Sequence, residues 1–369
     1  MTINLDKINR IRAARGYTKD TLRCDMAERG IYFPESFYKK VINSISQLDF
    51  LAYPDYSLYE DLSKKIGELH GVDPSRVLLG AGSDSLLKAI IQTECLCKNK
   101  SLIIPIPSFP MVAIYAEGLG VTVVNLEINS PISFDVESII SKIDESVGLI
   151  IISDPMSPYG QELNIAQRRR LIDESGKRNI TVVFDQAYGE FVEGYHPKDI
   201  CKSIYDSSNV IILKTLSKAA GLAGARVGYL VSSAQNSNRL SKVIETFPIS
   251  SISARVALEL ISQYEIVEEY SKAVCKERSL LVDTLKSLNI NVLNSATNSI
   301  HFEVPVEKYS LFLGLLKKSN VLAKYGDGIG TPVRVPGSNS TNWVRFSIFP
   351  DLSKTTFFIS LCRLFNVDK

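Results

Sequence analysis

Residues 147–188, VGLIIISDPMSPYGQELNIAQRRRLIDESGKRNITVVFDQAY, contain the pattern that decides the fold. A continuous apolar run (VGLIIIS) comes first, followed by an amphipathic stretch (IAQRRRLIDESGKR) and a second apolar run (ITVVF). Two short apolar strands joined by a helix are typical of a parallel sheet covered on both faces, and we expect the arginines on the solvated side of that helix. In such sheets, ligands bind at the carboxyl ends of the strands.

The same alternation of apolar run and helical stretch recurs through the first two thirds of the chain. We therefore predict an α/β fold with a mostly parallel, seven-stranded sheet and helices on both faces. The predicted strands lie within residues 76–82, 101–107, 121–128, 147–155, 180–188, 209–217 and 225–233.

The pattern changes near residue 250, where a long helical stretch begins. The sequence after it predicts a smaller α+β domain, with strands near 290–294, 299–304 and 343–349 and helices at 307–319 and 353–365. The expected division has three parts: an N-terminal arm that joins the small domain (1–45), a large domain (46–250), and an interdomain helix with the C-terminal small domain (251–369).

The composition is that of an ordinary globular protein. Of its 369 residues 45% are hydrophobic and 22% charged, and the formal net charge is +2, which indicates neither a nucleic-acid partner nor a disordered chain. Six cysteines and three histidines (His70, His196 and His301) are scattered, so no metal site, disulfide framework or Ser/His/Asp triad is expected. Each histidine is expected at the surface or in packing.

No apolar run approaches the length of a membrane helix, since the longest covers residues 147–152. The N-terminal residues lack the apolar core of a signal peptide and include Asp6 and Asp20. We expect no membrane partner and a cytoplasmic location.

Gly80 and Gly82 mark a turn from strand to helix, and Ser83 and Asp84 follow at the start of the helix. Free N–H groups and the helix dipole make such a place an anion site, suited to a phosphate. The alternative is a helix cap with no ligand. A dinucleotide fingerprint is not formed, because the third glycine position holds Ser85, and this disfavours an NAD-dependent oxidoreductase.

Asp185 and Tyr188 follow the apolar strand ITVVF. An acid at the carboxyl end of a strand is either a helix cap or a partner for a positive group, and the residue alone does not decide between them.

The segment 211–229, IILKTLSKAAGLAGARVGY, places two lysines among small and apolar residues. Thr215, Ser217 and Lys218 are followed by Arg226, and the small residues between them leave room for a planar ligand. The alternative is a glycine-softened loop between strands. Of the two lysines, Lys214 closes the strand and is expected to have a charge or packing role.

Together, these features predict a site for pyridoxal phosphate. The cofactor needs a phosphate cradle, an amine for its aldehyde, and a carboxylate that keeps the ring nitrogen protonated so that the ring can act as an electron sink. The sequence provides each of these: an anion site, lysines among small residues, and an acid at a strand end.

The chain resembles the aspartate aminotransferase superfamily, fold type I of the pyridoxal phosphate enzymes, and most closely its histidinol-phosphate aminotransferase branch. The resemblance rests on residues 53–87 (YPDYSLYEDLSKKIGELHGVDPSRVLLGAGSDSLL), 184–188 (FDQAY), 215–229 (TLSKAAGLAGARVGY) and 343–350 (WVRFSIFP). It implies that Lys218 forms the Schiff base, that Asp185 pairs with the pyridinium nitrogen, and that Tyr188 bonds the ring oxygen.

The resemblance also implies roles for other residues. The phosphate would bind the amides of Ser83 and Asp84 together with Thr215, Ser217 and Arg226. Tyr53 would reach in from a second subunit of a homodimer. Phe109 would stack on the ring and Arg345 would grip the substrate carboxylate, while Glu28 lies in a segment that covers the substrate in this family.

Two departures from the family pattern concern the ring oxygen and the substrate. Ser157 stands where the family places an asparagine beside the ring oxygen, and its shorter side chain needs a water to reach that oxygen. The loop around Arg334 does not present the usual arginine pattern of histidinol-phosphate enzymes, so whether Arg334 contacts substrate stays open.

The expected reaction is a ping-pong transamination between an amino acid, by resemblance glutamate, and a keto or phosphorylated keto acceptor. Both partners are small molecules. Two alternatives stay open: a decarboxylase of the threonine-phosphate decarboxylase type, which shares the cofactor residues, and a non-catalytic protein that binds pyridoxal phosphate.

Overall fold

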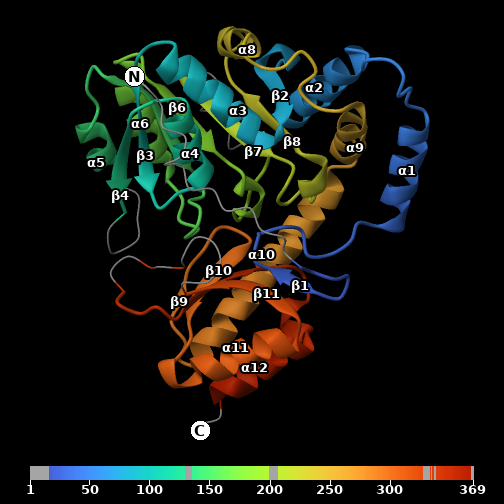
Figure 1. The fold of residues 1–369 in the computed structure, drawn as a ribbon, viewed down its shortest axis with the longest axis vertical. Helices are drawn as coiled ribbons and strands as arrows, with labels where there is room; N and C mark the ends of the chain where they lie inside the picture. Colours follow the sequence, from blue (N-terminus) through green and yellow to red (C-terminus); the bar gives the residue numbers. More distant parts are fainter. Residues whose placement is uncertain are drawn as a thin grey trace.

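The computed structural model describes residues 16–128, 135–198, 207–326, 333, 335 and 338–366. Its larger sheet has seven strands in the order β2-β8-β7-β6-β5-β3-β4, with β8 antiparallel to both of its neighbours and the other pairs parallel (Figure 1). Each predicted strand is present, so the predicted sheet is confirmed. The strands are β2 (Val77–Ala81), β3 (Ser101–Ile106), β4 (Val123–Glu127), β5 (Val147–Ser153), β6 (Thr181–Asp185), β7 (Val210–Thr215) and β8 (Val227–Val231).

The unit formed by β5, α6 (Ile165–Gly176) and β6 shows why these residues fold as they do. Helix α6 begins at a capping box in which the side chains of Asn164 and Gln167 each bond the other residue's backbone N–H. The two strands then pair in parallel, with Leu149 opposite Thr181.

The strands are apolar on both sides because helices cover both faces of the sheet. Val182 and Phe184 of β6 pack into the core on one face, and Val183 between them packs into the core on the other. The covering helices are α2 (Ser57–His70), α3 (Gly82–Ile91), α4 (Pro110–Gly118), α5 (Val136–Ser141), α6 and α8 (Ala234–Ser241).

A second sheet of five strands lies beyond the carboxyl ends of the larger one, in the order β1-β11-β12-β10-β9 (Figure 1). Its strands are β1 (Leu22–Cys24), β9 (Val292–Leu293), β10 (Ser299–Glu303), β11 (Val321–Tyr325) and β12 (Trp343–Ser347). Helices α11 (Tyr309–Lys318) and α12 (Thr356–Asn366) pack on it, around Phe302, Phe312 and Phe346. The sequence predicted β9, β10 and β12 but missed β11.

The N-terminal segment divides between the two parts of the fold. Strand β1 pairs in parallel with β11, so the chain returns to the smaller sheet as expected, whereas α1 (Glu35–Ser46) packs against α9 (Ser251–Ile261). Helix α10 (Glu265–Ser287) runs from one sheet toward the other (Figure 1). The domain boundaries themselves stay a prediction.

Short turns complete the described elements. The 3-10 turns are Pro74–Arg76, Gly189–Phe191, Ala223–Ala225, Val306–Lys308 and Leu352–Lys354, and a π-helical stretch covers Gln92–Leu96. Within the described part of the chain, no helix is long and apolar enough to cross a membrane.

Candidate active site

A cavity of about 590 Å³ lies at the carboxyl ends of β5, β6 and β7, where the fold predicts a ligand site. It brings together most of the predicted site residues from separate parts of the chain. Those that line it are Glu28, Ser83, Asp84, Phe109, Ser157, Asp185, Tyr188, Thr215, Ser217, Lys218 and Arg226.

One end of this cavity is built to hold an anion. Helix α3 begins at Gly82, whose φ of 71° puts it in the left-handed region, and a Cβ there would lie 2.7 Å from Nη2 of Arg226. Arg226 is also left-handed, with a φ of 52°, and its Nη2 donates to Asp84 at 3.0 Å. The helix N-terminus and this guanidinium therefore face the same space, which suits a phosphate.

Two hydroxyl groups extend the anion site. Thr215 donates to Ser217 Oγ at 3.0 Å, and Arg226 Nη1 donates to the same oxygen at 3.4 Å. Both hydroxyls line the cavity, so the predicted set of phosphate donors lies together.

Asp185 is the buried acid of the site. It ends β6, and its Oδ1 accepts a bond from the backbone N–H of Ala187 at 3.1 Å, so it shapes the local turn as well as lining the cavity. Burial raises the pKa of its carboxyl to about 6, against the opposing effect of that hydrogen bond and of the charge on Lys218. A cationic ring nitrogen would supply the charge partner that this carboxyl lacks.

Lys218 lies at the centre of the cavity. Its Nζ donates to the backbone oxygen of Met26 at 2.9 Å and lies 5.4 Å from the ring centroid of Tyr188. Burial raises the pKa of Tyr188, but the charges of Lys218 and Arg345 and a hydrogen bond with Ser157 outweigh it, so the pKa lies below its usual value. A more acidic phenol is a stronger hydrogen-bond donor, so the hydroxyl of Tyr188 is suited to donate to an anionic oxygen.

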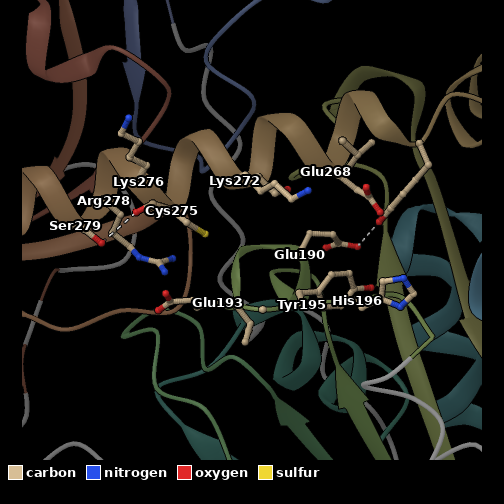
Figure 2. A pocket seen from close by; sticks show the side chains of 15 residues that line it. Glu190, Glu193, Tyr195, His196, Glu268, Lys272, Cys275, Lys276, Arg278 and Ser279 are labelled. Carbon is tan, nitrogen blue, oxygen red and sulfur yellow. Dashed lines mark hydrogen bonds between the residues drawn. The ribbon is translucent and has the colours of Figure 1, made fainter.

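Lys214 has the charge role that the sequence suggested. Only 1% of it is exposed, and its Nζ lies 2.8 Å from a carboxylate oxygen of Glu190 and 3.0 Å from the hydroxyl of Tyr195. Glu190 and Tyr195 line a separate cavity against α10 (Figure 2), and Lys218 is not among its lining residues. Lys214 is therefore committed to an ion pair, whereas Lys218 faces the site.

A second cavity of about 420 Å³ adjoins the first and shares Phe109, Ser157, Tyr188 and Lys218 with it. Its far wall includes Arg345 of β12, whose Nη2 donates to the backbone oxygen of Asp25 at 3.0 Å. Within the described part of the chain, the buried Nε of Arg345 has no hydrogen-bond partner. This arrangement leaves part of the guanidinium available to a substrate carboxylate.

Among the predicted site residues that the structure describes, Tyr53 is not brought into either cavity. Tyr53 is 83% exposed and its ring stacks on Phe247 with centroids 5.0 Å apart, outside both cavity linings. Arg334 lies outside the described residues. Glu28 does line the first cavity, where it pairs with Arg23 at 3.3 Å.

Sequence reasoning missed His301 and Lys324, which line the second cavity. The expectation of a surface or packing position fits His196, which is exposed, and His70, which is buried in packing. It did not place His301 beside a cavity. Its only sequence signal is its position on the strand of residues 299–304, two residues before Glu303, and no motif marks it.

The residues present fit pyridoxal phosphate, because the anion site, the buried acid and the lysine border one cavity of suitable size. A model of the aminotransferase class I and II family matches residues 30–357. The chain belongs to this family. Membership confirms the predicted aminotransferase activity and pyridoxal phosphate as its cofactor, and it favours amino transfer over the decarboxylase and the non-catalytic protein.

Individual relatives of this aminotransferase are similar over most of their length. The histidinol-phosphate aminotransferase of Thermoanaerobacter sp. (strain X514) is 28% identical over 321 residues, which are 86% of this chain and 88% of the relative. These relatives confirm the resemblance to the histidinol-phosphate branch.

Solved structures confirm the type I fold. The histidinol-phosphate aminotransferase from Clostridium acetobutylicum has a TM-score of 0.78 at 21% identity and covers 94% of this chain and 98% of its own. The enzyme from Sinorhizobium meliloti, solved in complex with pyridoxal-5'-phosphate, has a TM-score of 0.76 at 20% identity and covers 94% of this chain and 91% of its own.

Proposed function

We propose that this aminotransferase binds its cofactor covalently through Lys218 and transfers an amino group between glutamate and a keto or phosphorylated keto compound. The observation that carries this proposal is the position of Lys218, which lines both cavities. Of the two lysines in this segment, Lys214 is buried in an ion pair and cannot take that role.

The bound cofactor would supply an electron sink for the charge that develops at the substrate Cα. Asp185 would stabilise a protonated ring nitrogen, and Tyr188 with Ser157 would bind the ring oxygen. The amides of Ser83 and Asp84 with Thr215, Ser217 and Arg226 would hold the phosphate, and Phe109 would stack on the ring.

Lys218 Nζ also moves the proton that leaves the substrate Cα, because a displaced amine remains tethered beside that atom. Arg345 binds the α-carboxylate in a bidentate pair and so orients the Cα–H bond toward Lys218. Glu28 belongs to the N-terminal segment proposed to cover the substrate, and whether Arg334 contacts the substrate stays open.

We further propose that the enzyme acts in the cytoplasm as a homodimer with Tyr53 reaching the phosphate of the partner's cofactor. Exposed apolar surface supports this proposal, because it favours contact with another protein chain. Phe50, Leu51 and Tyr53 are apolar and aromatic residues that are exposed and lie outside the cavities.

A transfer assay tests the function. The holoenzyme is incubated with glutamate and a series of keto compounds, including phosphorylated ones, while 2-oxoglutarate and CO₂ are both measured. Formation of 2-oxoglutarate that depends on the acceptor, without CO₂, supports the proposal. Release of CO₂ without 2-oxoglutarate contradicts it and indicates a decarboxylase.

A further inference from the structure

Three side chains form a polar row along one face of the smaller sheet. His301 of β10 lies opposite Arg345 of β12, and Arg345 lies opposite Lys324 of β11. Directly opposed residues point to the same face of a sheet, and all three line the second cavity. The register of the strands therefore places an imidazole beside the guanidinium that is proposed to bind the substrate carboxylate.

His301 is buried, and one of its ring nitrogens lacks a hydrogen bond within the described part of the chain. Only 1% of the residue is exposed, and its Nδ1 has no hydrogen-bond partner among the residues that the structure describes. His70, an equally buried histidine, differs, because its Nδ1 lies 3.1 Å from the Pro197 oxygen and its Nε2 lies 2.9 Å from the Tyr229 hydroxyl. A buried polar atom left without a partner is costly, which indicates that a ligand supplies the missing bond.

The charge around His301 decides what that ligand carries. Burial, and then the charge of Arg345, lower the pKa of His301 to about 3, so the ring is neutral near pH 7 and has one N–H to donate. Lys218, Lys324 and Arg345 line the same cavity, and none of the described residues of its lining is Asp or Glu. An oxyanion is favoured there and a cationic group is disfavoured.

We propose that His301 is a specificity-determining residue whose Nδ1–H donates to a side-chain oxyanion, a carboxylate or a phosphate, of the substrate whose α-carboxylate binds Arg345. The inference rests on the proposed function in its assignment of Arg345. The ring of Tyr159, whose centroid lies 5.6 Å from that of His301, packs beside the imidazole and limits its rotation. A neutral donor is well suited to this place, because it recognises an anion without adding a fourth cation.

Binding of unreactive ligands to the holoenzyme tests the inference without turnover. Glutarate carries two carboxylates, 4-phosphonobutyrate replaces one with a phosphonate, and pentanoate has one carboxylate and an apolar end. In His301→Leu, we expect the dissociation constant of the preferred dianion to rise roughly tenfold to a hundredfold, as for one hydrogen bond to a charged group, and that of pentanoate to stay unchanged. Glutarate and 4-phosphonobutyrate then distinguish a side-chain carboxylate from a phosphate.

Two further variants control for packing. His301→Asn keeps an N–H donor near the position of Nδ1 and is expected to recover most of the dianion affinity. His70→Leu removes an equally buried histidine away from the cavity and is expected to leave all three dissociation constants unchanged.

A measurement on the unaltered ring covers the case in which His301→Leu does not fold. With ¹⁵N-labelled histidine, the Nδ1 signal of His301 is expected to shift to that of a donating nitrogen on addition of a dianion but not of pentanoate. Equal effects on dianions and pentanoate, or no effect on either, would overturn the inference. Because these ligands do not react, a failure of amino transfer from glutamate counts against the proposed function alone.

Discussion

The two sheets build the two sides of the active site in different ways. The larger sheet contributes residues at or just beyond the ends of its strands, such as Asp185 at the end of β6 and Lys218 after β7. The smaller sheet contributes residues from the face of its strands, where His301 and Arg345 lie opposite each other. A strand end is visible in a sequence, but a shared face depends on register, so the cofactor side is predictable and the substrate side is much less so.

The largest expected effect concerns the cofactor side. Replacing Lys218 by Ala removes both the covalent link and the base, so the rate of amino transfer should fall by about a thousandfold or more. Lys218→Arg keeps the charge but lacks the primary amine, so its rate of amino transfer should fall by the same factor. Steady-state transfer rates measure this, and an alanine variant within tenfold of the wild type would remove Lys218 from its proposed role.

The second effect concerns Lys214 of β7, which we expect to act on the stability of the protein, in contrast to Lys218. Lys214→Met leaves Glu190 buried and unpaired, which should lower the free energy of unfolding by about 3 to 5 kcal/mol. Adding Glu190→Gln should restore much of that loss. Urea denaturation measures both variants, and a Lys214→Met protein as stable as the wild type would show that the ion pair contributes little.

The third effect is the pH dependence that Asp185 gives to the cofactor-free protein. Its pKa in the folded state, about 6, lies above the reference value of 3.8, so the native state holds the proton more tightly than the unfolded state. The contribution to stability is fully present below the reference pKa of 3.8 and is lost, by about 3 kcal/mol, as the pH rises from there through 6. Urea denaturation at about pH 4.5 and about pH 7.5 should show about 2 kcal/mol of this loss in the wild type, and Asp185→Asn should lack it.

If Asp185→Asn and the wild type had the same dependence on pH over this range, another group would be responsible for it. The other groups of the fold titrate in both proteins, so the difference between the two curves isolates Asp185.

The fourth effect concerns the substrate side. Arg345→Lys keeps the positive charge but loses the bidentate fork, so the KM for glutamate should rise roughly tenfold to a hundredfold with a smaller change in kcat. A change confined to kcat would show instead that Arg345 acts on the reaction and not on carboxylate binding.

The smallest effect tests the proposed second subunit. Tyr53→Phe removes one hydroxyl, and we expect about fivefold weaker binding of the cofactor at concentrations where the protein is dimeric. Tyr32 is another exposed tyrosine, and Tyr32→Phe is the matched control. Equal affinities in all three proteins, or a monomer in sedimentation equilibrium, would contradict a role for Tyr53 across an interface.

The sequence predicted the larger sheet in full, because most of its strands are apolar runs separated by helical stretches. It also predicted that Asp185, Thr215 and Lys218 line one cavity, since they lie at or just after strand ends that must meet at one edge. It missed β11, whose sequence VLAKY has only three apolar residues before a lysine, so no long apolar run marks it.

His301 could not be predicted for a related reason. A lone histidine in the strand SIHFE gives no sign that Arg345, far along the chain, lies opposite it. Such a pair becomes visible only when the register of β10 and β12 is known.

The most direct test of the account is the site of covalent attachment, because the comparison of the two sheets assumes that they meet at Lys218. The holoenzyme is reduced with borohydride and digested, and the peptides are identified by mass spectrometry. The account predicts a cofactor-derived mass on Lys218, an unmodified Lys214, and no adduct in Lys218→Ala. An adduct on another lysine of the wild type, or one that persists in Lys218→Ala, would contradict it.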